Sequence, residues 1–344
     1  MKHLLGMTAG ELAAEIQSLG ERAFRARQIA EWVWKKRAVS FSEMSDLPAE
    51  LRGRLAGRLE ILTARLVRQV RSADGTLKGL LELHDAEHIE AVAIPTAGRL
   101  TACVSTQVGC AMGCAFCATG LEGLRRNLTA GEIVEQVFHL QAAAGRRVTN
   151  VVFMGMGEPL ANYGATVSAV RALIDPERMG LSARHVTVST IGLPKPIRRL
   201  AAEKLPITLA ISLHAPTDAL RRRLVPAAGK VALEDILEAA EVFYQSRHRE
   251  LTLEYVLLAG VNDTRPCAEA LGRIALRLRC NVNLILYNSV SGLEFERPAW
   301  PVTHAFAQQL RSQGVNVHLR RSRGLDIAGA CGQLRQSARQ DSAR

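Results

Sequence analysis

The sequence of 344 residues lacks an apolar run of the length that a membrane span requires, about 20 residues. Residues 1–10 also lack the long apolar stretch of a secretory signal peptide. Internal repeats and low-complexity blocks are absent, and hydrophobic residues make up 48% of the chain, which excludes wholesale disorder. We therefore expect a folded cytoplasmic protein without a membrane partner.

Acidic residues are scarce relative to basic ones. The sequence has 33 Asp and Glu against 44 Lys and Arg, so its formal net charge is +11. A surplus of this size favours a polyanionic partner, because each phosphate that a basic side chain neutralises releases counterions. RNA or DNA is the expected partner, and a soluble protein that is merely basic is the alternative.

The N-terminal third of the chain shows two kinds of pattern. Residues 8–19 and 25–36 place apolar side chains at helical spacing, which predicts a helical domain over residues 1–60. Asp74-Gly75 then lies between two alternating apolar runs, which is a hairpin signal, and a third strand follows. This pattern predicts a β-hairpin connector over residues 61–97.

Strand and helix patterns alternate from residue 98 to residue 334, which predicts a parallel β/α architecture. Catalytic groups in a barrel of this kind lie at the C-terminal ends of the strands. Residues 335–344 are expected to be a disordered tail. The expected strands are residues 100–105, 150–154, 185–190, 207–213, 251–258, 281–287 and 315–319. The expected helices are residues 130–145, 162–174, 193–202, 233–245, 264–278 and 302–313.

Four of the seven cysteines crowd into residues 103–117, and Cys110, Cys114 and Cys117 form a CxxxCxxC loop directly after the first barrel strand. In a reducing compartment such crowding points to metal binding or catalysis. Three close thiolates can hold a [4Fe–4S] cluster and leave one iron open for a further ligand. The alternative is a zinc knuckle, which usually has four ligands in pairs; no fourth Cys or His follows at a matching distance.

CxxxCxxC is the motif of the radical S-adenosylmethionine (SAM) superfamily. Five longer segments of the sequence indicate which family within this superfamily it resembles. These are CVSTQVGCAMGCAFCATG at 103–120, RNLTAGEI at 126–133, FMGMGEPL at 153–160, SLHA at 212–215 and ACGQL at 330–334. With them the sequence resembles the RlmN family of dual-specificity 23S rRNA and tRNA adenine C2-methyltransferases, over about residues 20–334. The resemblance implies an α/β fold, an incomplete (β/α)6 TIM-like radical SAM barrel with a small helical N-terminal domain and a short β segment.

The resemblance also implies cofactors and catalytic residues. A [4Fe–4S] cluster on Cys110, Cys114 and Cys117 and two SAM molecules per turnover are expected. Cys331 resembles the residue that accepts a methyl group from one SAM, before a 5′-deoxyadenosyl radical from the second SAM acts on it. Cys103 resembles the residue that forms a transient disulfide with Cys331. A thiolate suits the first step because C2 of adenine is electrophilic and does not attack a sulfonium methyl itself.

Glu90 matches the position of a proton acceptor in this family, but Cys103 is an equal candidate for removing the ring proton. The resemblance further implies a set of SAM contacts at strand ends, in which glycine lets the backbone approach the ligand and Glu158 pairs with the amino group. The set consists of Gly157, Glu158, Ser189, Ser212, Leu213, His214 and Asn288. Two departures from the family pattern, Ala328-Gly329 before Cys331 and Ser289 after Asn288, remove no chemical group that the mechanism needs.

Each of these assignments has an alternative in which the residue has no catalytic or binding role. Cys103 can be a buried strand residue, Cys331 a chance thiol, and a lone His214 a structural residue. Cys267 and Cys280 match no motif and are expected in the core.

Cations lie beside aromatic residues in the second N-terminal helix, where Trp32 and Trp34 are expected in the core and the cations on an RNA-binding surface. The cations are Arg25, Arg27, Lys35, Lys36 and Arg37, and further basic clusters are residues 221–223 and Arg320, Arg321 and Arg323.

An RNA adenine C2-methyltransferase is therefore the leading hypothesis, with 23S rRNA and tRNA as substrates. A Cfr-type adenine C8-methyltransferase is the nearest alternative, and Pro159 favours the C2 family. A non-catalytic, metal-stabilised RNA-binding module is the alternative from another class. The resemblance also implies an electron donor such as flavodoxin or ferredoxin, and we expect a monomer.

Overall fold

The structure of the chain is a computed structural model that describes residues 1–247 and 251–335. The expected tail spans residues 335–344, and all of it except Arg335 lies outside the described residues. A ten-stranded mixed sheet forms the centre of the fold, with strand order β14-β13-β12-β11-β10-β9-β6-β5-β4-β3. No helix of the described residues is long and apolar enough to cross a membrane.

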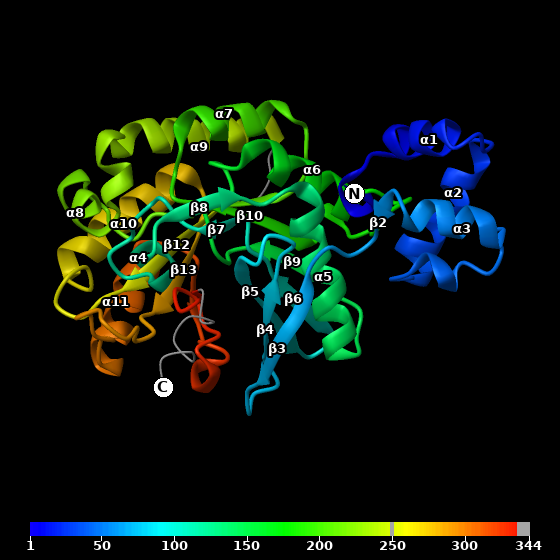
Figure 1. Cartoon of the computed structure of the whole chain (residues 1–344). Coiled ribbons are helices and arrows are strands. Elements are labelled where there is room, and N and C mark those ends of the chain that lie inside the picture. Colours follow the sequence, from blue (N-terminus) through cyan, green and yellow to red (C-terminus); the bar gives the residue numbers. More distant parts are fainter. Residues whose placement is uncertain (248–250, 336–344) are drawn as a thin grey trace.

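Seven strands of this sheet are parallel, and each of them falls where the sequence predicts a strand. They are β6 (Arg99–Cys103), β9 (Asn150–Phe153), β10 (Val186–Thr190), β11 (Thr208–Ser212), β12 (Leu251–Leu257), β13 (Asn281–Leu286) and β14 (Val317–Arg320). The helices between them cover one side of the sheet (Figure 1). They are α5 (Ala130–Ala144), α6 (Tyr163–Ile174), α7 (Pro194–Ala202), α8 (Asp218–Leu224), α9 (Leu233–Arg247), α10 (Arg265–Leu278) and α11 (Trp300–Ser312).

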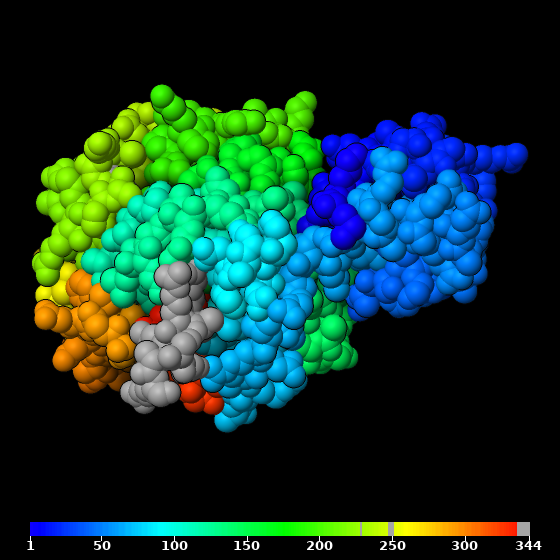
Figure 2. Space-filling model, viewed as in Figure 1, coloured from blue at the N-terminus to red at the C-terminus, as the bar shows by residue number. Residues whose placement is uncertain are grey.

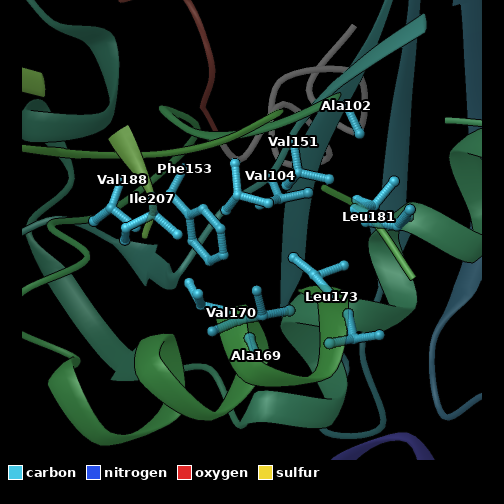
Figure 3. Packing of buried hydrophobic residues seen from close by; sticks show 14 of the residues in the cluster. Ala102, Val104, Val151, Phe153, Ala169, Val170, Leu173, Leu181, Val188 and Ile207 are labelled. Carbon is cyan, nitrogen blue, oxygen red and sulfur yellow. The ribbon is translucent and has the colours of Figure 1, made fainter. Parts of the chain in front are cut away.

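Local sequence explains where α5 begins and ends. The Thr129 side chain accepts from the Glu132 backbone, and the Glu132 carboxylate accepts from the Thr129 backbone in return. Gly145 then ends the helix with a φ of 61°, in the left-handed region that favours glycine. The core lies between the helices and the sheet, where Val170 and Leu173 of α6 face Val151 and Phe153 of β9 (Figure 3).

The connector strands join the barrel sheet instead of standing apart from it. β3 (Arg65–Arg71), β4 (Leu77–Glu82) and β5 (His88–Thr96) form an antiparallel meander, and β5 pairs with β6. A second hairpin, β7 (Gln107–Gly109) with β8 (Leu124–Asn127), was not expected and flanks the cysteine loop on both sides. That hairpin contains only short strands, so alternation of apolar residues gives no signal for it.

Helices form a lobe at the N-terminus (Figure 2). They are α1 (Ala9–Ser18), α2 (Phe24–Glu31), a π-helical turn (Trp32–Lys36) and α3 (Ala49–Ala56), and β1 (Lys2–His3) pairs with β2 (Leu59–Glu60). Trp34 is buried, as expected, whereas Trp32 is only partly buried and donates to Asp46. Arg178 fixes this lobe to the barrel, because its guanidinium lies 4.5 Å from the Trp34 ring centroid and donates to the Leu5 carbonyl at 2.7 Å.

Candidate functional site

A pocket opens at the C-terminal ends of the parallel strands, and ten of the predicted site residues line it. They are Cys110, Cys114, Cys117, Gly157, Glu158, Ser189, Ser212, His214, Asn288 and Cys331. Three predicted residues are not part of its lining: Leu213, Cys103 and Glu90. Residues more than 200 positions apart in the sequence are thus brought together, because parallel strands present their carboxyl ends at one edge of the sheet.

The cysteine loop is held at both ends by backbone contacts. The Cys110 backbone donates to the Gly123 carbonyl at 2.8 Å, where β7 and β8 close the hairpin, and the Cys117 backbone donates to the Cys114 carbonyl at 3.1 Å. Gly109 must be glycine, since its φ is 75° and a Cβ there would lie 2.0 Å from the Gly123 carbonyl oxygen. The loop is therefore shaped by its backbone before any ligand binds.

The three thiols have the chemistry that a cluster requires. Burial raises the pKa of Cys110 to about 11, and burial together with its two neighbouring thiols raises the pKa of Cys114 well above its usual range. Bound iron stabilises such thiols as thiolates. Within the described residues no three Cys, His or acidic side chains converge as the ligands of a single ion would. Cys110, Cys114 and Cys117 line one pocket, and three thiols are the donor set of a cubane that binds its cysteines at separate corners, so the residues fit a cluster.

Glu158 is buried and both of its carboxylate oxygens accept backbone hydrogen bonds, from Leu160 at 2.9 Å and from Ile191 at 2.8 Å. Burial nevertheless raises its pKa. Gly157 precedes it with a φ of 100°, and a Cβ there would lie 2.6 Å from the Gln107 side chain. In the structure this glycine lets the chain pass close to the segment after β6, which is a different reason for glycine from the approach to a ligand that the sequence suggests.

Ser189 and Ser212 end neighbouring strands, and their hydroxyl oxygens are 3.0 Å apart. His214 follows with a φ of 57°, and its Nδ1 accepts from the Val256 backbone at 3.0 Å. Burial lowers the pKa of His214 to about 3, so its ring is neutral. Leu213 points into the hydrophobic core, so only its backbone is available to the site.

The segment that carries Cys331 is docked on the cysteine loop. The Ala118 backbone donates to the Gly332 carbonyl at 2.8 Å, and the Thr119 hydroxyl donates to the Leu334 carbonyl at 2.6 Å. Asn288 donates to the Cys331 carbonyl at 3.1 Å. Desolvation by the pocket wall raises the pKa of the Cys331 thiol to about 11, with the Cys117 thiol adding to the effect. Cys331 is thus a positioned thiol beside the cluster cysteines.

The family departure before Cys331 has a visible consequence. Ala328 adopts a φ of 48°, which favours glycine, and Gly329 donates back to the Gly324 carbonyl at 2.8 Å. Lys78 donates to the Ala328 carbonyl at 3.3 Å. The loop is therefore fixed by hydrogen bonds despite the extra freedom of its glycine.

Cys103 and Glu90 lie on β6 and β5, outside the pocket lining. Burial raises the pKa of Cys103 to about 12, and the Cys331 thiol is the next largest cause, so the two sulfurs are neighbours. All seven cysteines are free thiols in this structure. Glu90 is 1% exposed, forms an ion pair with Lys78 at 2.9 Å, and accepts from the Arg335 backbone at 2.9 Å.

Sequence reasoning missed Glu254, a buried acid of β12 that lines the pocket. Its Oε1 accepts from Asn283 at 2.8 Å and lies 3.4 Å from Arg320, whereas its Oε2 has no hydrogen-bond partner among the described residues. Burial raises its pKa. An acid in the middle of an otherwise apolar strand was the available signal, because such a residue is rarely buried without a function or a partner.

The structure corrects part of the expected RNA-binding surface. Arg221 is 1% exposed, so this member of the basic cluster at residues 221–223 cannot contact RNA. Lys35 donates to the carbonyls of Pro176 and Arg178, which joins the N-terminal lobe to the barrel. Arg27 and Arg37 are exposed. The two unassigned cysteines behave as expected, since Cys280 is buried and Cys267 packs against the core.

Comparisons with known proteins agree with this site. The radical SAM superfamily model matches residues 104–267, and the ribosomal RNA large subunit methyltransferase N-terminal domain matches residues 2–61. The fold and the pocket thus define a radical SAM enzyme. A probable dual-specificity RNA methyltransferase RlmN of Rhodopirellula baltica is 44% identical, covering 97% of this chain and 91% of that protein. The RlmN of Solidesulfovibrio magneticus is 44% identical, covering 97% of each chain.

A crystal structure of a radical SAM methyltransferase from Sphaerobacter thermophilus matches with a TM-score of 0.95 and 45% identity, over 98% of this chain and all of that one. This chain belongs to the RlmN family of radical SAM RNA methyltransferases. Its cofactors are a [4Fe–4S] cluster and SAM, with two SAM molecules used per cycle. The C8-methyltransferase alternative is not favoured, and an enzyme of this family is not the non-catalytic RNA-binding module.

Proposed function

We propose that this enzyme methylates C2 of adenine in 23S rRNA and tRNA, with Cys331 as the methyl carrier and Cys103 as the resolving thiol. The main support for this proposal is the hydrogen bond from the Ala118 backbone to the Gly332 carbonyl, which docks the Cys331 segment beside the CxxxCxxC loop. This contact keeps a thiol of the far C-terminal segment inside the pocket of the cluster cysteines. A redox partner such as flavodoxin or ferredoxin, a monomeric state and a cytoplasmic location are part of the same proposal.

Cys110, Cys114 and Cys117 would hold the cluster, and the strand-end residues would hold SAM. They are Gly157, Glu158, Ser189, Ser212, His214 and Asn288, with Leu213 through its backbone. When bound, the cluster and SAM supply a methyl group and a 5′-deoxyadenosyl radical. The hydroxyl groups of Ser189 and Ser212 hydrogen-bond to each other at 3.0 Å and both residues line the pocket, which suits a ligand rich in hydroxyl groups.

Cys103 and Glu90 are the two candidates for accepting the ring proton of adenine. The pKa of Cys103 is raised to about 12, so this thiol is protonated at neutral pH and is a poor proton acceptor. Glu90, which forms an ion pair with Lys78 at 2.9 Å, is the other candidate for accepting the ring proton of adenine. Cys103 then attacks the Cys331 sulfur that carries the base. The S–S bond forms as the bond between that sulfur and the methylene carbon breaks, and the Cys103 proton is delivered to this carbon, so that the methylated RNA leaves and a Cys103–Cys331 disulfide remains.

A trapped intermediate tests this order of events. Cys103→Ala should leave the early steps intact and accumulate a covalent protein–RNA adduct through Cys331. Cys331→Ala and the double variant should form none, because the methyl carrier is missing. The adduct is measured as a denaturant-resistant, RNase-sensitive shift on a gel, and the methylated base by mass spectrometry of digested RNA.

Cys267→Ala is the matched control, since this thiol packs against the core away from the pocket, and it should turn over like the wild type. Normal turnover by Cys103→Ala would return Cys103 to the role of a buried strand residue. An adduct that persists in Cys331→Ala would show that another residue carries the methyl group.

A further inference from the structure

Arg221 is the largest of the fully buried side chains, with 1% of its surface exposed. It lies on α8, and the next two residues of that helix, Arg222 and Arg223, are exposed. A buried cation is costly unless its charge and its N–H groups are compensated. The compensation of Arg221 therefore needs an explanation.

The two terminal nitrogens of Arg221 bind backbone carbonyls at the ends of two barrel strands. Nη1 donates to the carbonyl of Leu213 at 2.6 Å and lies 3.4 Å from that of Ser212, while Nη2 donates to the carbonyl of Ile191. These acceptors fix the guanidinium in place, and none of them carries a formal charge. The positive charge is thus positioned but not neutralised by its hydrogen-bond partners.

The third nitrogen, Nε, is buried and has no hydrogen-bond partner among the described residues. Leaving a buried donor unpaired costs about 1–3 kcal/mol, and more for a charged group. Such a group in a native fold calls for an acceptor that binds later, such as an ion. Arg221 can therefore bind a negatively charged group through its Nε–H donor and its positive charge.

Helix α8 forms the support of the cysteine loop. The Leu224 carbonyl, one turn after Arg221, accepts from the Ala115 backbone at 2.9 Å, and the Met112 carbonyl accepts from Ala227 at 3.3 Å. Leu220 and Leu224 belong to the apolar cluster that contains Cys114 and Cys117. Burial lowers the pKa of Arg221 to about 10, whereas the charges that Cys114, Asp218 and Glu158 can carry favour its charged form, Cys114 most of all.

We propose that Arg221 would serve as the buried counter-charge of the iron–sulfur cluster that Cys110, Cys114 and Cys117 would hold, with its unpaired Nε–H as a further donor. This inference rests on the proposed assignment of Cys110, Cys114 and Cys117. Thiolates give the cluster negative charge, and one-electron reduction adds more. Net charge and hydrogen bonds to sulfur set the potential of such clusters. A fixed cation therefore stabilises the reduced state and raises the midpoint potential.

Four reconstituted proteins test the proposal: the wild type, Arg221→Gln, Arg221→Lys and Arg223→Gln. Arg223→Gln is the matched control, because it removes the same charge from the same helix at an exposed position where water screens it. Iron content, the midpoint potential from an EPR-monitored redox titration, and thermal unfolding are measured on each sample. Arg221→Gln should titrate at a more negative potential than the wild type, Arg221→Lys between the two, and Arg223→Gln with the wild type.

A wild-type potential in Arg221→Gln with full iron content would overturn the proposal. If Arg221→Gln loses its iron, Arg221→Lys decides: a cluster retained near the wild-type potential supports the counter-charge. Loss of iron from the lysine variant as well, with a matching fall in unfolding temperature, would show that Arg221 only clamps the strand ends. Wild-type protein without about four irons would instead overturn the cluster assignment itself, which separates the two failures.

Discussion

The pocket and the N-terminal lobe use their charged side chains in opposite ways. In the pocket, ionisable groups lie among strand ends, and desolvation there raises the pKa values of Cys110, Cys331 and Glu254, although only Glu254 is fully buried and Cys331 is exposed. In the lobe, cations remain near the surface, and several serve local contacts, as Lys36 does with its ammonium 3.8 Å from the Trp32 ring centroid. The pocket therefore holds ionisable groups with raised pKa values, whereas the lobe carries cations that make local contacts at its surface.

Ligand binding is expected to stabilise the fold most where buried polar atoms lack partners. Nε of Arg221 and Oε2 of Glu254 both lack partners among the described residues, and both lie near the cysteine loop or the pocket.

The largest effect is expected in the pocket. Replacing Cys110, Cys114 or Cys117 with Ala should abolish iron binding, SAM cleavage and RNA methylation together, because three thiolates are the minimum for the open cluster. Production of 5′-deoxyadenosine by the reconstituted variant is the measurement, with Cys280→Ala as a control that leaves the loop intact. A variant that cleaves SAM at the wild-type rate would remove its cysteine from the cluster site.

A smaller effect is expected on RNA affinity in the lobe. Replacing Arg27 and Arg37 together with Ala should lower the slope of log affinity against log salt concentration by about 1.4 to 1.8, if each contacts one phosphate. Binding to a tRNA is titrated at several salt concentrations. Arg265→Ala removes an exposed cation of α10 and should leave the slope unchanged. An unchanged slope in the double variant would place the RNA elsewhere.

The contact between the lobe and the barrel should have a smaller effect, on the free energy of unfolding. Arg178→Ala removes the stacking on Trp34 and the hydrogen bond to the Leu5 carbonyl, which is buried. The expected loss in the free energy of unfolding is about 1–3 kcal/mol. Denaturant unfolding measures it, and Arg184→Ala, an exposed arginine of the same part of the barrel, should change stability little. Equal stability of Arg178→Ala and wild type would show that the lobe docks by its apolar contacts alone.

The smallest effect concerns pH. Burial raises the pKa of Glu254 in the folded state, so the folded protein binds this proton more readily than the unfolded chain. Stability should therefore fall as the pH rises from the ordinary carboxyl range through the higher folded pKa. Glu254→Gln should flatten that fall above the ordinary carboxyl range in thermal unfolding. Glu82→Gln is the control, since Arg65 holds the pKa of Glu82 below that range.

An equal pH slope in Glu254→Gln and the wild type would mean that a group in the pocket compensates the carboxylate. Arg320, whose guanidinium lies 3.4 Å from Glu254, is the first candidate.

Much of the fold followed from local patterns. The seven parallel strands lie where apolar runs predicted them, and the Thr129 capping box and Gly145 mark the ends of α5. The β7–β8 hairpin could not be predicted this way, because its strands are short and it is defined by the pairing of Gly109 with Leu124 across the cysteine loop. The connector meander also joined the barrel sheet through pairing that no local pattern encodes.

The sequence by itself determined the family and the CxxxCxxC loop, and it singled out Cys103 and Cys331 as candidates, because these depend on residue type and spacing along the chain. Only the tertiary structure decided which charges are buried. Arg221 and Arg222 are neighbours in one basic run, yet α8 turns the first into the barrel and the second toward solvent. Burial depends on what packs around a side chain, and for Arg221 that is two strand ends and a cysteine loop distant in sequence.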